Sequence, residues 1–135
     1  MNVAVRFYTR SGNTEKLANA IAEAIGEKAE SVSIPLAGKV DVLFLGCSYY
    51  AFDVDENVKK FIQENKSKIG KIVCFGTSAM MKSVYKPMKK VAEENGVEIE
   101  EEDFHCHGSF GLLHKGRPNA DDLNTAKLFA KRIMK

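Results

Sequence analysis

Residues 3–14 read Val-Ala-Val-Arg-Phe-Tyr-Thr-Arg-Ser-Gly-Asn-Thr, a mostly apolar run that stops at a small, hydroxyl-rich turn. A helical pattern begins directly after the turn. Where a parallel strand ends at the N-terminus of a helix, backbone N–H groups and the positive end of the helix dipole favour a bound phosphate. Short hydroxyl donors and a permissive glycine complete this turn, namely Thr9, Ser11, Gly12 and Thr14. We expect Asn13 to be the N-cap. The alternative interpretation is an ordinary strand-to-helix turn with capping residues.

Other phosphate-binding loops are excluded by what the turn lacks. A nucleoside-triphosphate loop closes in Gly-Lys-Ser/Thr, and a dinucleotide fold needs three spaced glycines with an acidic residue about 20 positions further on. A receiver domain of phosphate transfer needs acidic residues after its first strand and an Asp ending its third, where this chain has Thr9-Arg10 and Cys47-Ser48. A cysteine phosphatase loop needs a Cys in the first turn, and this turn has none.

Length and composition predict one domain, residues 1–135. With 44% hydrophobic residues, a chain of 135 residues buries about two-thirds of its unfolded surface and needs no disulfide to fold. Cys47, Cys74 and Cys106 are far apart and form no CxxC pair, which favours buried, reduced thiols. No apolar run approaches the roughly 20 residues of a membrane span, and the start lacks a secretion signal, so we expect a cytoplasmic protein without a membrane partner.

Strand and helix patterns alternate along the chain. We expect strands at 2–8, 30–34, 42–47, 71–76 and 97–106. The third and fourth are nearly continuous apolar runs, as in parallel strands covered by helices on both faces. The helical stripes between them are closed by Gly26 and Asn95-Gly96, and Pro87 falls in the first turn of the third helix or near its start. Right-handed crossovers then give an α/β fold, a doubly wound five-stranded parallel sheet.

One crossover is unusually short. Only residues 35–40 join the second and third strands, so the helix there is short or absent. In such sheets ligands sit beyond the carboxyl ends of the strands. Three segments meet at that edge: the turn after the first strand, residues 48–53 after the third, and residues 77–82 after the fourth.

This combination resembles the flavodoxin family over nearly the whole chain. Residues 8–14 match its phosphate loop, residues 45–48 enter its first flavin loop, and residues 75–77 enter its second. The tail, residues 104–108 followed by 115–119, looks like that of short bacterial flavodoxin-like proteins. The resemblance implies a flavodoxin-like sheet with strand order 2-1-3-4-5 and a bound FMN cofactor.

The resemblance also implies which residues bind FMN. The phosphate would lie in the turn after the first strand and the isoalloxazine ring between the two later loops. Tyr49 and Tyr50 are the stacking candidates, because a flat apolar ring suits an aromatic face, although either could instead be a surface tyrosine. Asp53 and Asp55 would place negative charge near the ring, and Asp55 also suits a helix N-cap. The full expected set is Thr9, Arg10, Ser11, Gly12, Asn13, Thr14, Ser48, Tyr49, Tyr50, Ala51, Phe52, Gly76, Thr77, Ser78, Ala79, His107 and Gly108.

Metal and nucleic-acid sites are disfavoured. His105 and His107 would share one face of an extended strand, but two ligands do not make a closed metal site, and a strand-end pair lining the cofactor cleft is the simpler interpretation. The basic residues are dispersed among acidic ones and lack an aromatic platform, so we expect no nucleic-acid partner. The acidic residues 98–103 suit a solvated edge strand.

Three functions follow from the resemblance. The favoured one is an electron carrier, in which FMN shuttles electrons between redox partner proteins. The second is a small FMN-dependent reductase that passes electrons from a nicotinamide cofactor to a quinone-type acceptor, although such reductases usually carry longer insertions. The third is a binding module without flavin, because the second loop offers Ala79, Met80 and Met81 and the chain has no Trp. A net charge of +2 and a pI near 8.4 differ from the acidic flavodoxins, so partner recognition must differ.

Overall fold

The computed structural model of the protein describes residues 1–9, 12–48, 54–77, 85–106 and 118–135. Its strands are β1 Val3–Tyr8, β2 Ala29–Ser31, β3 Val42–Ser48, β4 Lys71–Thr77, β5 Glu98–Ile99 and β6 Phe104–Cys106. Its helices are α1 Asn13–Ile25, α2 Glu56–Asn65, the short 3₁₀ helix η1 Lys66–Lys68, α3 Tyr85–Glu94 and α4 Ala120–Ile133.

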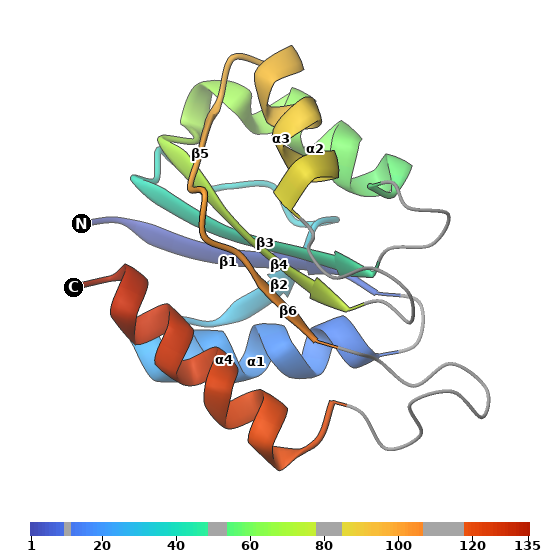
Figure 1. The fold of residues 1–135 in the computed structure, drawn as a ribbon. Coiled ribbons are helices and arrows are strands. Elements are labelled where there is room, and N and C mark those ends of the chain that lie inside the picture. The colour runs from blue at the N-terminus through green and yellow to red at the C-terminus, as the bar shows by residue number, and fades with distance from the viewer. Residues whose placement is uncertain (10–11, 49–53, 78–84, 107–117) are drawn as a thin grey trace.

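All the strands lie in one parallel sheet. The order is β2-β1-β3-β4-β5, and β6 also pairs with β4 (Figure 1). Because β5 pairs with the start of β4 and β6 with its end, the two share the fifth position of the sheet. The predicted α/β fold and strand order 2-1-3-4-5 are confirmed.

The predicted strand 97–106 is interrupted, which corrects the expectation of one continuous edge strand. Two acidic side chains in the interruption bond to different elements. Glu100 accepts from Lys71 of β4 at 2.7 Å, and Glu102 accepts from Arg132 of α4 at 2.7 Å. The chain leaves the regular ladder after Ile99 and rejoins it at Phe104, and the two ion pairs lie in the interval between them.

The helices cover both faces of the sheet. In Figure 1, α1 and α4 lie together on one face, and α2 and α3 lie on the other. Val5, Phe44 and Val73 point from the sheet toward the α1 and α4 side. Leu43, Leu45 and Ile72 alternate with them and point toward α2 and α3. Each face is therefore an apolar layer, as the nearly continuous apolar strands predict.

Most helix ends follow the predicted signals. Gly26 ends α1 and Gly96 follows α3, both in the left-handed region with φ of 72° and 69°. Asp55 caps α2, accepting a hydrogen bond from the Asn57 N–H at 2.8 Å. Pro87 lies in the first turn of α3. Asn119 and Asp122 form a reciprocal capping box at the start of α4.

The start of α1 corrects one expectation. The N-cap is Gly12 rather than Asn13, which is the first helical residue and is buried. Gly12 has φ 88°, and the turn reaches the helix through this left-handed residue. Asparagine is favoured at N-caps because its side chain accepts a hydrogen bond from the first turn of the helix. Glycine has no side chain, so α1 has no such bond from its N-cap.

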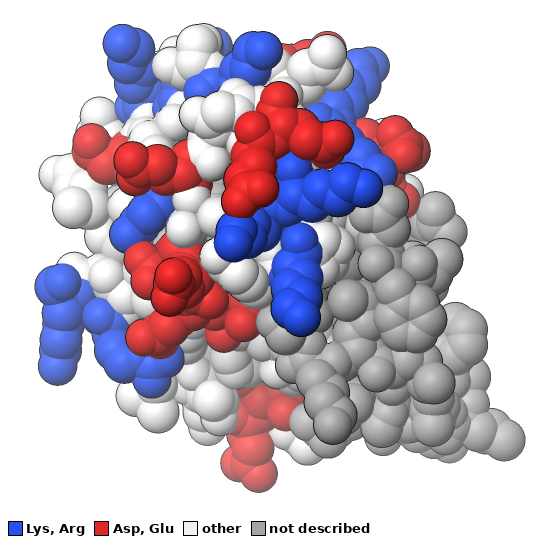
Figure 2. All heavy atoms as spheres, turned by 45° about the horizontal axis from the view of Figure 1, so that its top comes forward, with Lys and Arg blue, Asp and Glu red and all other residues white. Residues whose placement is uncertain are grey.

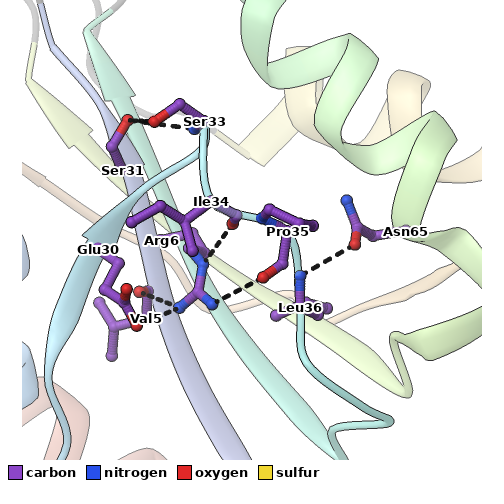
Figure 3. Close-up of polar contacts among 9 residues, drawn as sticks. All are labelled: Val5, Arg6, Glu30, Ser31, Ser33, Ile34, Pro35, Leu36 and Asn65. Carbon is purple, nitrogen blue, oxygen red and sulfur yellow. Dashed lines mark hydrogen bonds and ion pairs between the residues drawn. The ribbon is translucent and has the colours of Figure 1, made fainter.

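The β2 to β3 connection contains no helix, as predicted. The expected strand 30–34 ends early, because Ile34 N–H donates to the Ser31 carbonyl and turns the chain. Arg6 lies in β1 and is 6% exposed, and its side chain ties this connection to the sheet. Its guanidinium donates to the carbonyl oxygens of Ile34 at 3.0 Å and Pro35 at 3.3 Å (Figure 3).

Further bonds fix the same connection. Arg6 also donates to the Val5 carbonyl at 3.2 Å, and its guanidinium lies 3.7 Å from a Glu30 carboxylate oxygen (Figure 3). Asn65 at the end of α2 accepts the Leu36 N–H at 3.1 Å, and Lys68 donates to the Leu36 carbonyl at 3.0 Å. Leu36 itself enters the apolar layer beneath α2. Polar bonds from three elements thus do the positioning that a crossover helix would do.

The surface mixes charges of both signs. Figure 2 shows Lys and Arg interspersed with Asp and Glu over the described part of this face, with no large region of one sign. In the same described residues, no helix is long and apolar enough to cross a membrane.

Candidate functional site

The carboxyl ends of four strands meet at one edge of the sheet. In register, Tyr8 of β1 lies beside Cys47 of β3, Ser48 lies beside Thr77 of β4, and Thr77 lies beside Cys106 of β6. The three expected binding segments therefore leave the sheet from neighbouring strand ends. This is the edge at which ligands bind in open parallel sheets.

The turn between β1 and α1 is closed by its own hydroxyl. Thr9 Oγ1 accepts the Gly12 N–H at 2.9 Å, which ties the end of β1 to the N-terminus of α1. The Gly12 carbonyl then accepts the Lys16 N–H at 3.2 Å, the first bond of α1. A side chain built at Gly12 would meet nothing within 4 Å among the described residues. The first-turn N–H groups of a helix point out of its N-terminus, so this helix end offers donors to a phosphate, and the described residues leave space beside Gly12.

A buried hydroxyl pair connects this turn with the neighbouring strand. Thr14, the second residue of α1, and Thr77, the last residue of β4, have their Oγ1 atoms 3.0 Å apart. Thr14 is fully buried and Thr77 is 3% exposed. Both were expected at the site from the sequence, but no local pattern relates two residues 63 positions apart.

Below this edge, Gly46 makes room for an aromatic ring. Gly46 of β3 pairs with Phe75 of β4, and a Cβ at Gly46 would collide with the Phe75 ring. Phe75 is fully buried and belongs to the layer beneath α1 and α4. The glycine thus leaves the space that the Phe75 ring occupies beside β3, just before β3 and β4 end.

The described part of the site contains seven of the expected binding residues. They are Thr9, Gly12, Asn13, Thr14, Ser48, Gly76 and Thr77, all at the carboxyl edge or the adjoining turn. The other ten expected residues lie outside the described residues: Arg10, Ser11, Tyr49, Tyr50, Ala51, Phe52, Ser78, Ala79, His107 and Gly108. Their roles stay predictions, as does that of Asp53.

The cysteines are buried thiols. Burial raises the pKa of Cys74 well above its usual range, and the negative charge of Asp103 and the nearby Cys47 raise it further. Cys74 is therefore a neutral core side chain at physiological pH. Within the described ranges, no three His, Cys, Asp or Glu residues come together as metal ligands would, and His107 and His114 lie outside those ranges.

Solved structures define the class of this fold. A flavodoxin from the domain Archaea superposes on 98% of this chain and 96% of its own with a TM-score of 0.76 and 18% sequence identity. Oxidised Flavodoxin 2 from Bacillus cereus covers 99% and 98% with a TM-score of 0.71 and 16% identity. The chain has the flavodoxin fold, which confirms the resemblance drawn from its motifs.

A curated relative defines the family more narrowly. The uncharacterized protein MJ0298 of Methanocaldococcus jannaschii is 30% identical over 136 residues, an alignment that covers 91% of each chain. The chain belongs to the same family as this archaeal protein. No family model matches the chain.

Proposed function

We propose that this protein binds FMN at the carboxyl edge of its sheet and carries electrons between redox partner proteins in the cytoplasm. The observation that carries the proposal is the turn at Gly12. A left-handed glycine, whose Cβ position no described residue approaches within 4 Å, stands at the N-terminus of a 13-residue helix within the flavodoxin fold. That geometry suits the terminal phosphate of a flavin mononucleotide.

The residues at the edge fit the parts of FMN. Thr9, Gly12 and Asn13 would hold the phosphate through the turn and the first N–H groups of α1, with Ser11 as a further expected donor. The loops after Ser48 and Thr77 would hold the ring, and Tyr49 or Tyr50 would stack on it. When bound, FMN supplies reversible electron transfer, and the protein orients the ring and shields it from water.

The charge distribution supports a carrier that recognises partners without a single dominant charge. Both signs are interspersed on the face in Figure 2, and the net charge is +2. Docking would then rely less on long-range steering and more on the contact surface, so association should depend only weakly on salt.

Absorption spectroscopy tests the proposal directly. The protein purified without added cofactor, and again after titration with FMN, should show visible flavin bands. Stepwise anaerobic reduction should proceed in two one-electron stages. Direct two-electron reduction by a nicotinamide cofactor would instead indicate the reductase, and no bands with no binding of added FMN would refute both flavin functions.

A matched pair of glycine variants tests where FMN binds. Gly12→Ala places a methyl group in the proposed phosphate space, whereas Gly26→Ala makes the same change at the far end of α1. Both glycines have positive φ and open surroundings, so both variants should lose about 1 kcal/mol of stability from backbone strain. Only Gly12→Ala should weaken FMN binding. Equal FMN affinity in the two variants would remove the turn from the site.

A further inference from the structure

Thr14 and Thr77 are buried polar side chains at positions where apolar side chains of the same shape would also fit. Valine has nearly the shape of threonine, and a buried hydroxyl is unfavourable unless it is hydrogen-bonded. Two valines would fill the same space in an apolar layer that already contains Leu17 and Val73. One hydroxyl donates to the other, and such a directional bond fixes the relative position of two side chains more narrowly than apolar contact does.

The position that the pair fixes is that of two loops. Thr14 follows the turn that would hold the phosphate, and Thr77 immediately precedes the loop that would hold one side of the ring. The phosphate and the ring are joined in one ligand, so its affinity depends on both loops standing at the right separation. A bond between the bases of these loops sets that separation before the ligand arrives.

We propose that the Thr14–Thr77 hydroxyl pair is a positioning element that holds the phosphate turn and the second ring loop in register for FMN. This inference rests on the proposed function. Thr77 acts through its hydrogen bond to Thr14, so each hydroxyl contributes to the same link. Removing either one should loosen the same link.

Valine and serine variants test the pair. Thr14→Val, Thr77→Val and the double variant keep the side-chain shape and remove the hydroxyls. Thr77→Ser keeps the hydroxyl and removes only the methyl group. FMN and riboflavin, which lacks the phosphate, are titrated against each variant by flavin fluorescence. Asn65→Ala is the control, because it breaks buried hydrogen bonds to Leu36 and Phe61 near the far end of α2, away from the strand-end edge.

The pair predicts a specific pattern of affinities. Thr77→Val should bind FMN about tenfold more weakly, a change in binding free energy of the size that one hydrogen bond contributes. It should bind riboflavin within about twofold of the wild-type affinity. Thr77→Val should have no further effect in the Thr14→Val background. Thr77→Ser should bind FMN nearly as wild type does, and Asn65→Ala should lose stability without losing FMN affinity.

Several outcomes would overturn the inference. Unchanged FMN affinity in Thr77→Val would show that the link does not matter. Equal losses for FMN and riboflavin would place Thr77 at the ring alone, and additive losses in the double variant would show two separate roles. Wild-type protein that binds no FMN would refute the proposed function itself, and the positioning role would fall with it.

Discussion

Arg6 offers the sharpest test of how the β2 to β3 connection is held. Arg6→Met keeps a long unbranched side chain that fills the space of the arginine stem and removes the guanidinium. The variant loses the two long-range hydrogen bonds to the carbonyls of Ile34 and Pro35. The connection would then keep its bonds to Asn65 and Lys68 and the backbone hydrogen bonds of Val40.

The expected loss follows from these two bonds. Hydrogen bonds to a charged group contribute about 1.5–3 kcal/mol each, but both carbonyls are partly exposed and regain water, and the guanidinium no longer has to be desolvated. We expect a net loss of about 2–3 kcal/mol in the free energy of unfolding. For 135 residues the unfolding entropy is about 0.28 kcal/mol per kelvin, so the Tm should fall by about 7–11 °C.

Calorimetry and urea denaturation measure this loss, and a second variant separates its causes. Glu30→Gln removes only the ion pair with Arg6, whose atoms are 3.7 Å apart and whose carboxylate side chain is 32% exposed. It should lose no more than about 0.5 kcal/mol. A loss below about 1 kcal/mol in Arg6→Met, or an equal loss in Glu30→Gln, would refute the reasoning that the carbonyl bonds hold the connection.

Three further predictions concern other contacts. Gly46→Ala should destabilise the protein by about 1–3 kcal/mol in urea denaturation, because its methyl group displaces the Phe75 ring, and a neutral result would contradict the close approach. The hydrogen bond from Lys71 holds the pKa of Glu100 below its ordinary 4.5. The stability that this pair contributes is therefore complete above pH 4.5 and is lost as the pH falls through the lower pKa of the folded protein. Lys71→Met should remove this loss, so the free energy of unfolding should depend less on pH below 4.5 in the variant than in the wild type. Cys74 should react with a thiol reagent on the order of 100-fold more slowly in the native protein than in urea, since burial excludes the reagent and raises the pKa of the thiol, whereas comparable rates would show an open core.

The fold could be predicted because its signals are local. The apolar runs at β3 and β4 and the glycines after α1 and α3 each act through neighbours in sequence. The short β2 to β3 connection follows from chain length alone. Strand order then follows from the family resemblance and from the handedness of crossovers.

Long-range polar contacts could not be predicted in the same way. A lone arginine in an apolar strand gives no sign that its partners are the carbonyls of Ile34 and Pro35, because carbonyls carry no sequence signal. The acidic residues in the break between β5 and β6 pair with Lys71 and Arg132, which lie 29 and 30 positions away from them in sequence. At the site, the turn was recognisable from its residue types, but the N-cap moved by one residue and the link from Thr14 to β4 became visible only in three dimensions.

The packing of α1 against α4 has a consequence for synthesis on the ribosome. The Glu23 to Lys127 contact joins residues 104 positions apart, and the sheet face between these helices includes Val5, Phe44 and Val73. While the nascent chain lacks α4, that part of the face has no cover other than α1, and exposed apolar strands are prone to aggregation. This apolar face can therefore be fully covered only after residues 120–133 have been synthesised and have packed beside α1.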